Sequence, residues 1–521
     1  MLGKIGVLLI AAGIVCSAYG QETLSVVVTD GKGNRVRTLA RADFQVVSRG
    51  SKNDIVAFTD ATGAIPRRIA IVLDTTTISL PARVAIVDAT RDFLAKSLRP
   101  VDRVLILTAG QSLTPLSEWT SDKGQIEAAL QRASTATSQT MAGDRAQAER
   151  RVQELITNIQ QTRGTFDNFD TLMNAVRNYA AAVYRDTRQS IGLLATVTDL
   201  FPSRANRNVL IIGGAGLPIR PGADMFQYLD TVKAQAEQGL LGSALRQGAA
   251  RSSPMADANA FDLTQMLRDF AGEAWSRGIA IYTIDPEMSD SASTMVESQR
   301  TIDRAASFAT TANRSAGYQL IADETGGLAF LARKPSDAIA EIASDLDTFY
   351  SIGIQPSAPI ANRQSVQIQS KGYKIRFTPG GGQPTADAEI SSRVIAHHLL
   401  KPDTNDLGIT VQAATPVAEG EKRRVALKVM IPIKNLKFVQ EGSEVTGGFS
   451  VYIATGDRLG HASSVTKQTK QLRWPAAALQ AAGDKQLTFA VEVVLEPGRT
   501  QISVGVLDDR SKTTGYERVS I

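Results

Sequence analysis

A carboxylate followed by a run of hydroxyl groups is the clearest candidate for chemistry in this chain. The apolar stretch RIAIVLDTTTIS, residues 68–79, reaches Asp74 and then continues into four hydroxyl residues. An apolar, β-branched run without alternation predicts a central strand of a parallel sheet, buried on both faces. Ligands of open α/β sheets bind outside the carboxyl ends of the strands, so a binding site is expected at Asp74. A turn or a helix cap is the structural alternative for such an aspartate.

The sequence argues against nucleophilic catalysis at this place. The single cysteine, Cys16, lies near the N-terminus, and His397, His398 and His461 all lie outside the predicted α/β region. Neither a Ser-His-Asp nor a Cys-His arrangement can therefore be built there, and we expect that the protein is not an enzyme. His397 and His398 lie in or beside the predicted linker and are expected to be solvated loop residues. Successive residues on a strand point to opposite sides, so the pair makes poor joint metal ligands.

A glycine turn ends another predicted buried strand, in the stretch NVLIIGGAG, residues 208–216. A turn of this kind can cradle a phosphate at the start of a helix. No Lys-Ser or Lys-Thr pair follows it, however, and Pro218 intervenes. Gly213 and Gly214 therefore indicate a plain turn at the end of a strand.

Strands and helices alternate along residues 64–349. Further strands are expected at 102–108, 278–285 and 324–330, and helices at 81–98, 166–184, 261–275 and 338–349. This alternation predicts an α/β domain with a doubly wound, mainly parallel sheet and helices on both of its faces.

Sequence with a period of two flanks this domain on both sides. The N-terminal strands of residues 21–63 are too few to close a core alone, so we expect them to pair with the strands of residues 350–380 and complete a β-sandwich. The α/β domain would then be inserted into that sandwich. Residues 381–405 carry turn signals typical of a linker, and the short strands of residues 406–521 predict a second antiparallel β-sandwich.

Residues 1–20 have the pattern of a secretory signal peptide. Lys4 precedes an apolar core from Ile5 to Val15, and Ala18 and Gly20 form a small-residue cleavage arrangement. The apolar part is too short to span a membrane, with a single N-terminal anchor as the alternative. We therefore expect a secreted or periplasmic protein whose mature part does not span a membrane. Its formal net charge of +5 is scattered without a basic block, so no nucleic-acid partner is expected.

Several short segments follow one another along the chain: VVTDGKG from Val27 followed by Ala42-Asp-Phe44, RIAIVLDT, IYTID, ADETGG, and DLDTFYSIGI with the following KGYKIRFTPG. Their order resembles the von Willebrand factor type A-related proteins abundant in Acidobacteria. The resemblance runs from about residue 23 to the C-terminus, and members of this group are mostly secreted or envelope proteins of unassigned role.

The resemblance implies a place for a divalent cation. Type A domains commonly hold one through D-x-S-x-S after the first strand, a threonine from a second loop and an aspartate after the fourth strand, and hard cations prefer such oxygen ligands. Asp74 and Thr76 match the first two positions, and Thr165 resembles the second-loop threonine. These three residues are the implied metal ligands.

Two departures from this pattern imply a degenerate metal site. Ile78 stands where the third hydroxyl is expected, with Ser79 one residue late, and Gly213-Gly214 stands where the aspartate belongs. At most, Mg²⁺ would be bound weakly, and no other cofactor is expected.

Two hypotheses about function follow. In the first, the protein is an exported, non-enzymatic binding module that recognises a protein partner through its type A-like domain. In the second, it is a structural or assembly component of the cell envelope. The binding surface expected under the first hypothesis combines Asp74, Thr76, Ser79, Thr165, Gly213 and Gly214.

Overall fold

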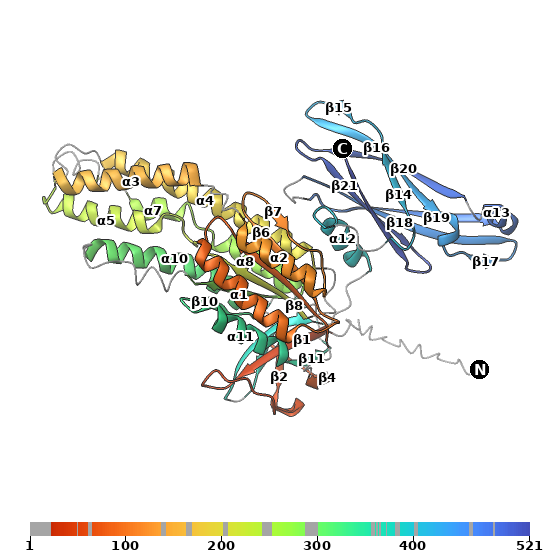
Figure 1. Ribbon diagram of the computed structural model, residues 1–521, viewed down its shortest axis with the longest axis horizontal. Coiled ribbons are helices and arrows are strands. Elements are labelled where there is room, and N and C mark those ends of the chain that lie inside the picture. Colours follow the sequence, from red (N-terminus) through yellow and green to blue (C-terminus); the bar gives the residue numbers. More distant parts are fainter. Residues whose placement is uncertain are drawn as a thin grey trace, which may run out of the picture.

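The computed structural model, shown in Figure 1, describes the chain in several stretches. The predicted signal peptide, Thr165 and His461 lie outside them. The described residues are 22–48, 50–60, 65–136, 142–162, 169–201, 207–241, 249, 253–286, 301–355, 360, 363, 366–370, 372–380, 386–400, 405–457, 462–482 and 485–521.

A six-stranded sheet forms the centre of the α/β part, with the strand order β10-β9-β8-β5-β6-β7. Five of its strands are parallel, and β7 pairs with β6 in the antiparallel direction. The apolar run that begins at Arg68 forms β5, which is buried along most of its length, as a central strand must be. The strands are β5 (Arg67–Asp74), β6 (Arg103–Ala109), β7 (Leu113–Pro115), β8 (Arg207–Gly213), β9 (Ile279–Asp285) and β10 (Ala329–Leu331).

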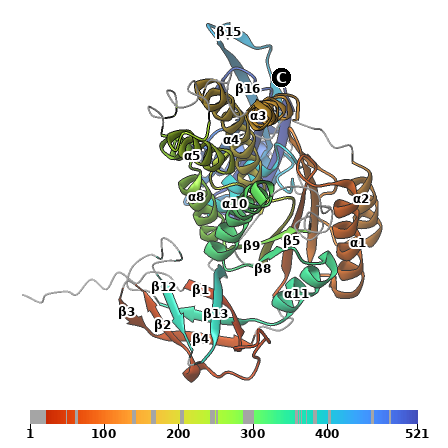
Figure 2. The ribbon, with the colours of Figure 1, turned by 90° about the vertical axis from the view of Figure 1, so that its left-hand side faces the viewer.

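Helices cover both faces of this sheet (Figure 2). Because successive strand residues face opposite sides, Ile69 and Ile71 pack with one layer of helices, while Ala70 and Val72 pack with the other. The first layer is α1 (Leu80–Ser97), α2 (Lys123–Thr135) and α11 (Pro335–Asp347), and the second is α8 (Thr264–Ser276), α10 (Thr301–Thr325) and the C-terminal half of α4 (Phe169–Asp199).

A helical arm extends from the sheet, as Figure 1 shows. It consists of α3 (Ala142–Thr162), the N-terminal half of α4, α5 (Ala223–Glu237) and α7 (Pro254–Asn259). It has a hydrophobic core of its own, which includes Leu155, Val176 and Phe226. The predicted helix over residues 166–184 is therefore only the first part of a 31-residue helix that serves two cores.

The N-terminal strands pair with the strands that follow the α/β part. In the first sheet β1 lies between β11 and β13, and in the second β12 pairs with β2. Alternate residues from both sheets share one core, which explains why neither group alone could close it. The strands are β1 (Glu22–Thr29), β2 (Gln45–Ser48), β3 (Ser51–Asn53), β4 (Ile55–Asp60), β11 (Tyr350–Ile354), β12 (Val366–Gln369) and β13 (Lys374–Gly380).

A buried carboxylate connects this sandwich to the α/β part. Asp345 of α11, whose side chain is completely buried, forms ion pairs with Arg35 after β1 and with Arg376 of β13. The hydroxyl of Tyr282 in β9 donates a third hydrogen bond to it, over 3.0 Å. Both arginines come from the sandwich, so the charge of Asp345 is balanced only when the two parts are together.

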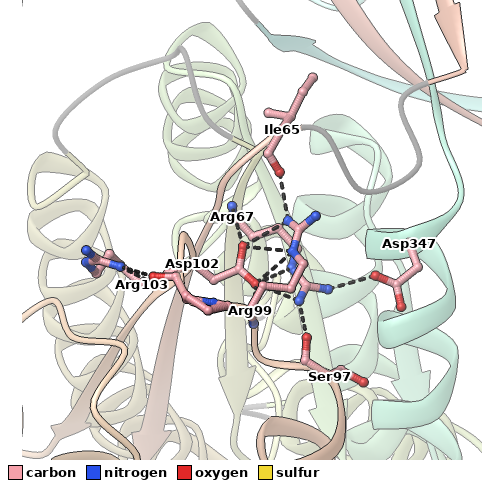
Figure 3. Close-up of polar contacts among 8 residues, drawn as sticks. Ile65, Arg67, Ser97, Arg99, Asp102, Arg103 and Asp347 are labelled. Atoms are coloured by element: carbon pink, nitrogen blue, oxygen red, sulfur yellow. Dashed lines mark hydrogen bonds and ion pairs between the residues drawn. The ribbon is translucent and has the colours of Figure 1, made fainter.

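A second buried ion network closes the end of the sheet opposite to Asp74 (Figure 3). Arg67 at the start of β5 forms a salt bridge with Asp102, and Arg99 pairs with the other carboxylate oxygen over 2.8 Å. Arg67 also reaches Asp347 over 2.8 Å and the carbonyl of Ser97. These contacts join three segments at the amino ends of the strands and leave the carboxyl ends as the place for a binding site.

Residues 405–521 form two antiparallel sheets that share one hydrophobic core. Strands are present where the alternating pattern predicts them, and β16 and β18, with 11 and 13 residues, extend beyond the short strands expected. The elements are β14 (Thr410–Ala413), β15 (Val417–Glu419), β16 (Lys422–Pro432), β17 (Val439–Glu441), β18 (Glu444–Gly456), β19 (Thr466–Pro475), α13 (Ala476–Ala481), β20 (Gln486–Leu495), β21 (Gln501–Asp508) and β22 (Thr514–Ser520).

The segment predicted as a linker, residues 381–405, contains a helix, α12 (Ala386–Ala396). Its apolar side chains Ile390 and Val394 are buried against β18 and β21. The prediction of solvated loop histidines was wrong, because His397 and His398 follow this helix and are 4% and 2% exposed. Polar and turn-forming residues on both sides of the helix hid its short apolar stripe.

No helix in the described part of the chain is long and apolar enough to cross a membrane.

Candidate functional site

The predicted strand-end residues meet at the point where the strand order reverses. β5 lies between β6 and β8, and the chain leaves it on one side for β6 and returns on the other at β8. Asp74 is the last residue of β5, and its neighbour Leu73 pairs with Gly213, the last residue of β8. The loops after β5 and β8 therefore flank the topological switch point, where open α/β sheets bind ligands.

The carboxylate of Asp74 accepts hydrogen bonds from the loop that follows it. Its Oδ1 accepts hydrogen bonds from the backbone N–H and the hydroxyl of Thr76, over 2.8 and 2.6 Å. Its Oδ2 accepts one from the hydroxyl of Thr77, over 2.8 Å. Asp74 is 8% exposed, whereas both threonines are half-buried. The aspartate thus fixes the turn in which its hydroxyl neighbours present themselves at the surface.

Thr77 also connects the two loops of the switch point. Its Oγ1 accepts a hydrogen bond from the backbone N–H of Ala215, over 3.2 Å. A hydroxyl can donate one hydrogen bond and accept others, so Thr77 can serve Asp74 and Ala215 at once. Sequence reasoning did not select Thr77 from the hydroxyl run, because its second partner lies 138 residues away along the chain.

Gly214 has no room for a side chain. A Cβ at this position would lie 2.4 Å from the hydroxyl oxygen of Tyr318 and 3.2 Å from the Cβ of Asp74. At Gly213, a Cβ would lie 2.8 Å from Ile86 and 2.9 Å from Leu73. The place where a type A domain is expected to carry its aspartate is thus filled by a phenol from α10.

Tyr318 is a member of the site that no local sequence signal reveals. It is 1% exposed, and burial raises the pKa of its phenol well above the ordinary value, with the charges of Asp74 and Asp285 raising it further. The phenol is therefore neutral and keeps its proton near neutral pH. Asp285, the last residue of β9, is 1% exposed and supplies a second carboxylate at this end of the sheet.

Ser79 caps a helix. Its hydroxyl accepts a hydrogen bond from the backbone N–H of Ala82 over 3.4 Å, at the N-terminus of α1. This contact is typical of a serine at an N-cap. Leu80, the next residue, is 53% exposed and adds an apolar side chain to the same loop. Thr165, the remaining predicted site residue, lies outside the described residues.

The described residues do not fit a type A cation site. Asp74 and Thr76 could supply one carboxylate and one hydroxyl, and hydrogen bonds from Thr76 and Thr77 hold that carboxylate within its loop. The position of the second carboxylate is occupied by the hydroxyl of Tyr318. No group of three or more His, Cys, Asp or Glu side chains that could hold a metal ion occurs among the residues that the structure describes.

Comparisons with known proteins find likeness at the level of structure. Neither a protein-family model nor a curated protein matches the sequence. The von Willebrand factor domain of the type V pili tip protein Mfa5 from Porphyromonas gingivalis is 14% identical, with a TM-score of 0.25, and the match covers 54% of this chain and 94% of that one. A von Willebrand factor type A structure from Catenulispora acidiphila is 8% identical, with a TM-score of 0.24, and the match covers 91% and 75%.

A further similar structure is an aerotolerance-related membrane protein from Bacteroides fragilis. It is 11% identical, with a TM-score of 0.24, and the match covers 54% of this chain and 98% of that one. Type A domains are thus among the solved structures that this chain is similar to, and the likeness to the acidobacterial group stays a prediction.

Proposed function

We propose that this protein is an exported, non-enzymatic binding module that recognises a protein partner at the loops after β5 and β8 without a bridging cation. The observation that carries the proposal is the pair of hydrogen bonds that the hydroxyls of Thr76 and Thr77 donate to the Asp74 carboxylate at the switch point of the sheet. A loop that is already hydrogen-bonded within itself offers a preformed surface, which lowers the cost of ordering on binding.

Side chains of different character are accessible on this surface. Thr76 and Thr77 are half-buried hydroxyl residues, and Leu80 beside them is 53% exposed. Binding sites combine an apolar anchor with a few polar groups that fix orientation. Leu80 is the proposed anchor, and the threonines supply hydrogen bonds to the partner.

The experiment is capture of partners from an envelope extract by the immobilised protein, with and without EDTA. Capture that survives EDTA and is lost in Leu80→Ser supports the proposal. Leu240→Ser is the matched control, because Leu240 is also an exposed leucine, at 63%, but lies just beyond α5 of the helical arm. Equal loss in both variants, or loss with EDTA alone, would contradict the proposal.

N-terminal sequencing of the exported protein tests cleavage after Gly20.

A second candidate function is a structural component of the cell envelope, which the buried Asp345 network favours. Ion pairs to Arg35 and Arg376 fix the first sandwich to the α/β part, as a load-carrying assembly would need. In that case association with cell-wall material would be insensitive to EDTA and to Leu80→Ser. It would instead depend on exposed sandwich residues such as Val417, which is 66% exposed.

A further inference from the structure

The segment from α12 to Leu400 is the joint between the α/β part and the C-terminal sandwich. Ile390 and Val394 pack against Tyr452 and other residues of the sandwich. Ala396 and Leu400 instead belong to the hydrophobic core that α4 and α8 form on one face of the central sheet. The relative placement of the two parts therefore depends on how firmly α12 is docked on the sandwich.

Two buried histidines lie at this joint. The ring of His397 meets Tyr516 edge-on, with centroids 4.8 Å apart. The ring of His398 lies against the end of β18, so closely that a Cβ on Gly456 would be 2.7 Å from its Nδ1. Among the residues that the structure describes, neither ring nitrogen of His398 has a hydrogen-bond partner. A buried imidazole without an acceptor is tolerated only in its neutral form.

Most of the charged groups around His398 oppose its protonation. Arg518 of β22 donates hydrogen bonds to the backbone carbonyls of His397 and His398, over 3.1 and 2.9 Å. Burial lowers the pKa of His398 to about 4, and the charges of Arg518, Arg499 and His397 act in the same direction. Asp457, after β18, acts in the opposite direction. Ala396 and Leu400, which share a core with α4, carry no charge.

We propose that His398 is an acid-sensitive latch, whose protonation loosens α12 from the sandwich and frees the C-terminal sandwich to move relative to the α/β part. The undocked imidazole would have its ordinary pKa of 6.5, and the docked one is lower. The undocked state therefore binds more protons between these values. Docking is strongest above pH 6.5 and weakens as the pH falls toward 4.

Hydrogen exchange of the full-length mature protein, followed by mass spectrometry between pH 7 and pH 4.5, tests this proposal. After correction for the intrinsic pH dependence of exchange, the amides of α12 should exchange at least about tenfold faster at pH 4.5. The amides of β5 and β8 should stay protected. The rise should reverse when the pH is restored, and uniform loss of protection in all elements would overturn the proposal.

Two variants and one direct measurement assign the effect to His398. In His398→Leu, which cannot titrate, the acid-dependent rise in exchange should disappear, whereas in the matched control His397→Gln it should persist. The reverse pattern would overturn the proposal. If His398→Leu does not fold, imidazole NMR of the parent protein decides. A His398 titration near pH 4 that coincides with the rise in α12 exchange supports the latch, and titration near pH 6.5 or without that rise excludes it.

Discussion

The guanidinium of Arg67 and the carboxylate of Asp102 meet at 2.7 Å in the interior, where their side chains are 1% and 0% exposed. Asp102 also accepts the backbone N–H of Arg67 over 2.9 Å, so the pair fixes the start of β5. The strand β5, which carries Asp74 at its carboxyl end, is therefore fixed at its amino end. Rigid support of this kind is what a preformed binding loop requires.

Removal of one partner from this pair should be costly. Asp102→Ala leaves Arg67 buried with only Asp347 and the carbonyl of Ser97, and we expect a loss of about 3 kcal/mol in the free energy of unfolding. Chemical denaturation measures this. Asp88→Ala is the control, because Asp88 pairs with Arg91 at the surface and is 60% exposed, so its loss should be below about 1 kcal/mol. Similar losses in both variants would contradict the assignment.

The pair of Arg67 and Asp102 should also make the free energy of unfolding depend on pH in the acid range. Burial would raise the pKa of Asp102, but hydrogen bonds from Arg99 and Arg67 outweigh it and lower the pKa from 3.8 to about 2. The unfolded chain then binds more protons than the folded one between these values, so the stabilisation is complete above pH 3.8 and is lost as the pH falls toward 2. Denaturation midpoints measured from pH 5 to pH 2 should fall less steeply in Asp102→Asn than in the parent. Parallel curves would show that Asp102 does not contribute.

Much of the fold can be predicted from local patterns, because each pattern directly reflects burial. The unbroken run from Arg68 to Asp74 became β5, and the alternating strands after Tyr350 paired with those before residue 60. The helix α12 was missed although Ile390 and Val394 stand four residues apart, since this stripe is short and has turn-forming sequence on both sides.

The site could be predicted only in part, for a physical reason. The spacing of Asp74 and Thr76 is local, and it correctly marked the end of the strand. The filling of the second carboxylate position depends on Tyr318, which comes from a helix more than a hundred residues later than Gly214. The sequence shows Gly214 as a turn glycine. It does not show that the side chain of Tyr318 leaves no room for a Cβ at this position, because tertiary packing brings the two residues together.

The phenol of Tyr318 and Gly214 should be energetically coupled. Gly214→Ala places a Cβ 2.4 Å from the hydroxyl oxygen of Tyr318, and overpacking of this kind costs about 1–3 kcal/mol. In the Tyr318→Phe background the hydroxyl is gone, so the same substitution should cost at least about 1 kcal/mol less. A double-mutant cycle in urea measures the coupling. Gly31→Ala is the control, because none of the described residues lies within 4 Å of a Cβ there. Strict additivity at Gly214 and Tyr318 would contradict the contact.

The strand-end loop should bind Mg²⁺ weakly or not at all, because Gly214 stands where the second carboxylate is expected and the hydroxyl of Tyr318 fills that space. Titration calorimetry of the mature protein with Mg²⁺ and Mn²⁺, repeated on Asp74→Ala, measures this. Partner affinity should fall by about 1 kcal/mol in Asp74→Ala, the usual effect of losing one hydrogen-bonding group. Micromolar metal affinity in the parent that vanishes in Asp74→Ala would show a working metal site instead.

The effect of Asp345→Asn on the free energy of unfolding should differ between the whole protein and its isolated α/β domain. In the whole protein Asp345→Asn removes a buried charge that Arg35 and Arg376 compensate, and loss of one partner from such a cluster costs about 3–5 kcal/mol. In the fragment of residues 64–349 both arginines are absent together with the sandwich that covers the carboxylate, and the hydrogen bond from Tyr282 remains. Water can then hydrate the carboxylate, so Asp345→Asn should change the free energy of unfolding of the fragment by less than about 1 kcal/mol.

Urea denaturation of four proteins, the parent and Asp345→Asn in both lengths, measures this difference. Glu341→Gln is the matched control on the same helix, because Glu341 lies nearer the surface, with its side chain 30% exposed, and pairs with Arg35 at 3.4 Å. Its effect should be below about 1 kcal/mol in both lengths. If Asp345→Asn destabilises the fragment as much as the whole protein, the carboxylate acts within the α/β domain alone, and the ion pairs do not fix the sandwich to it.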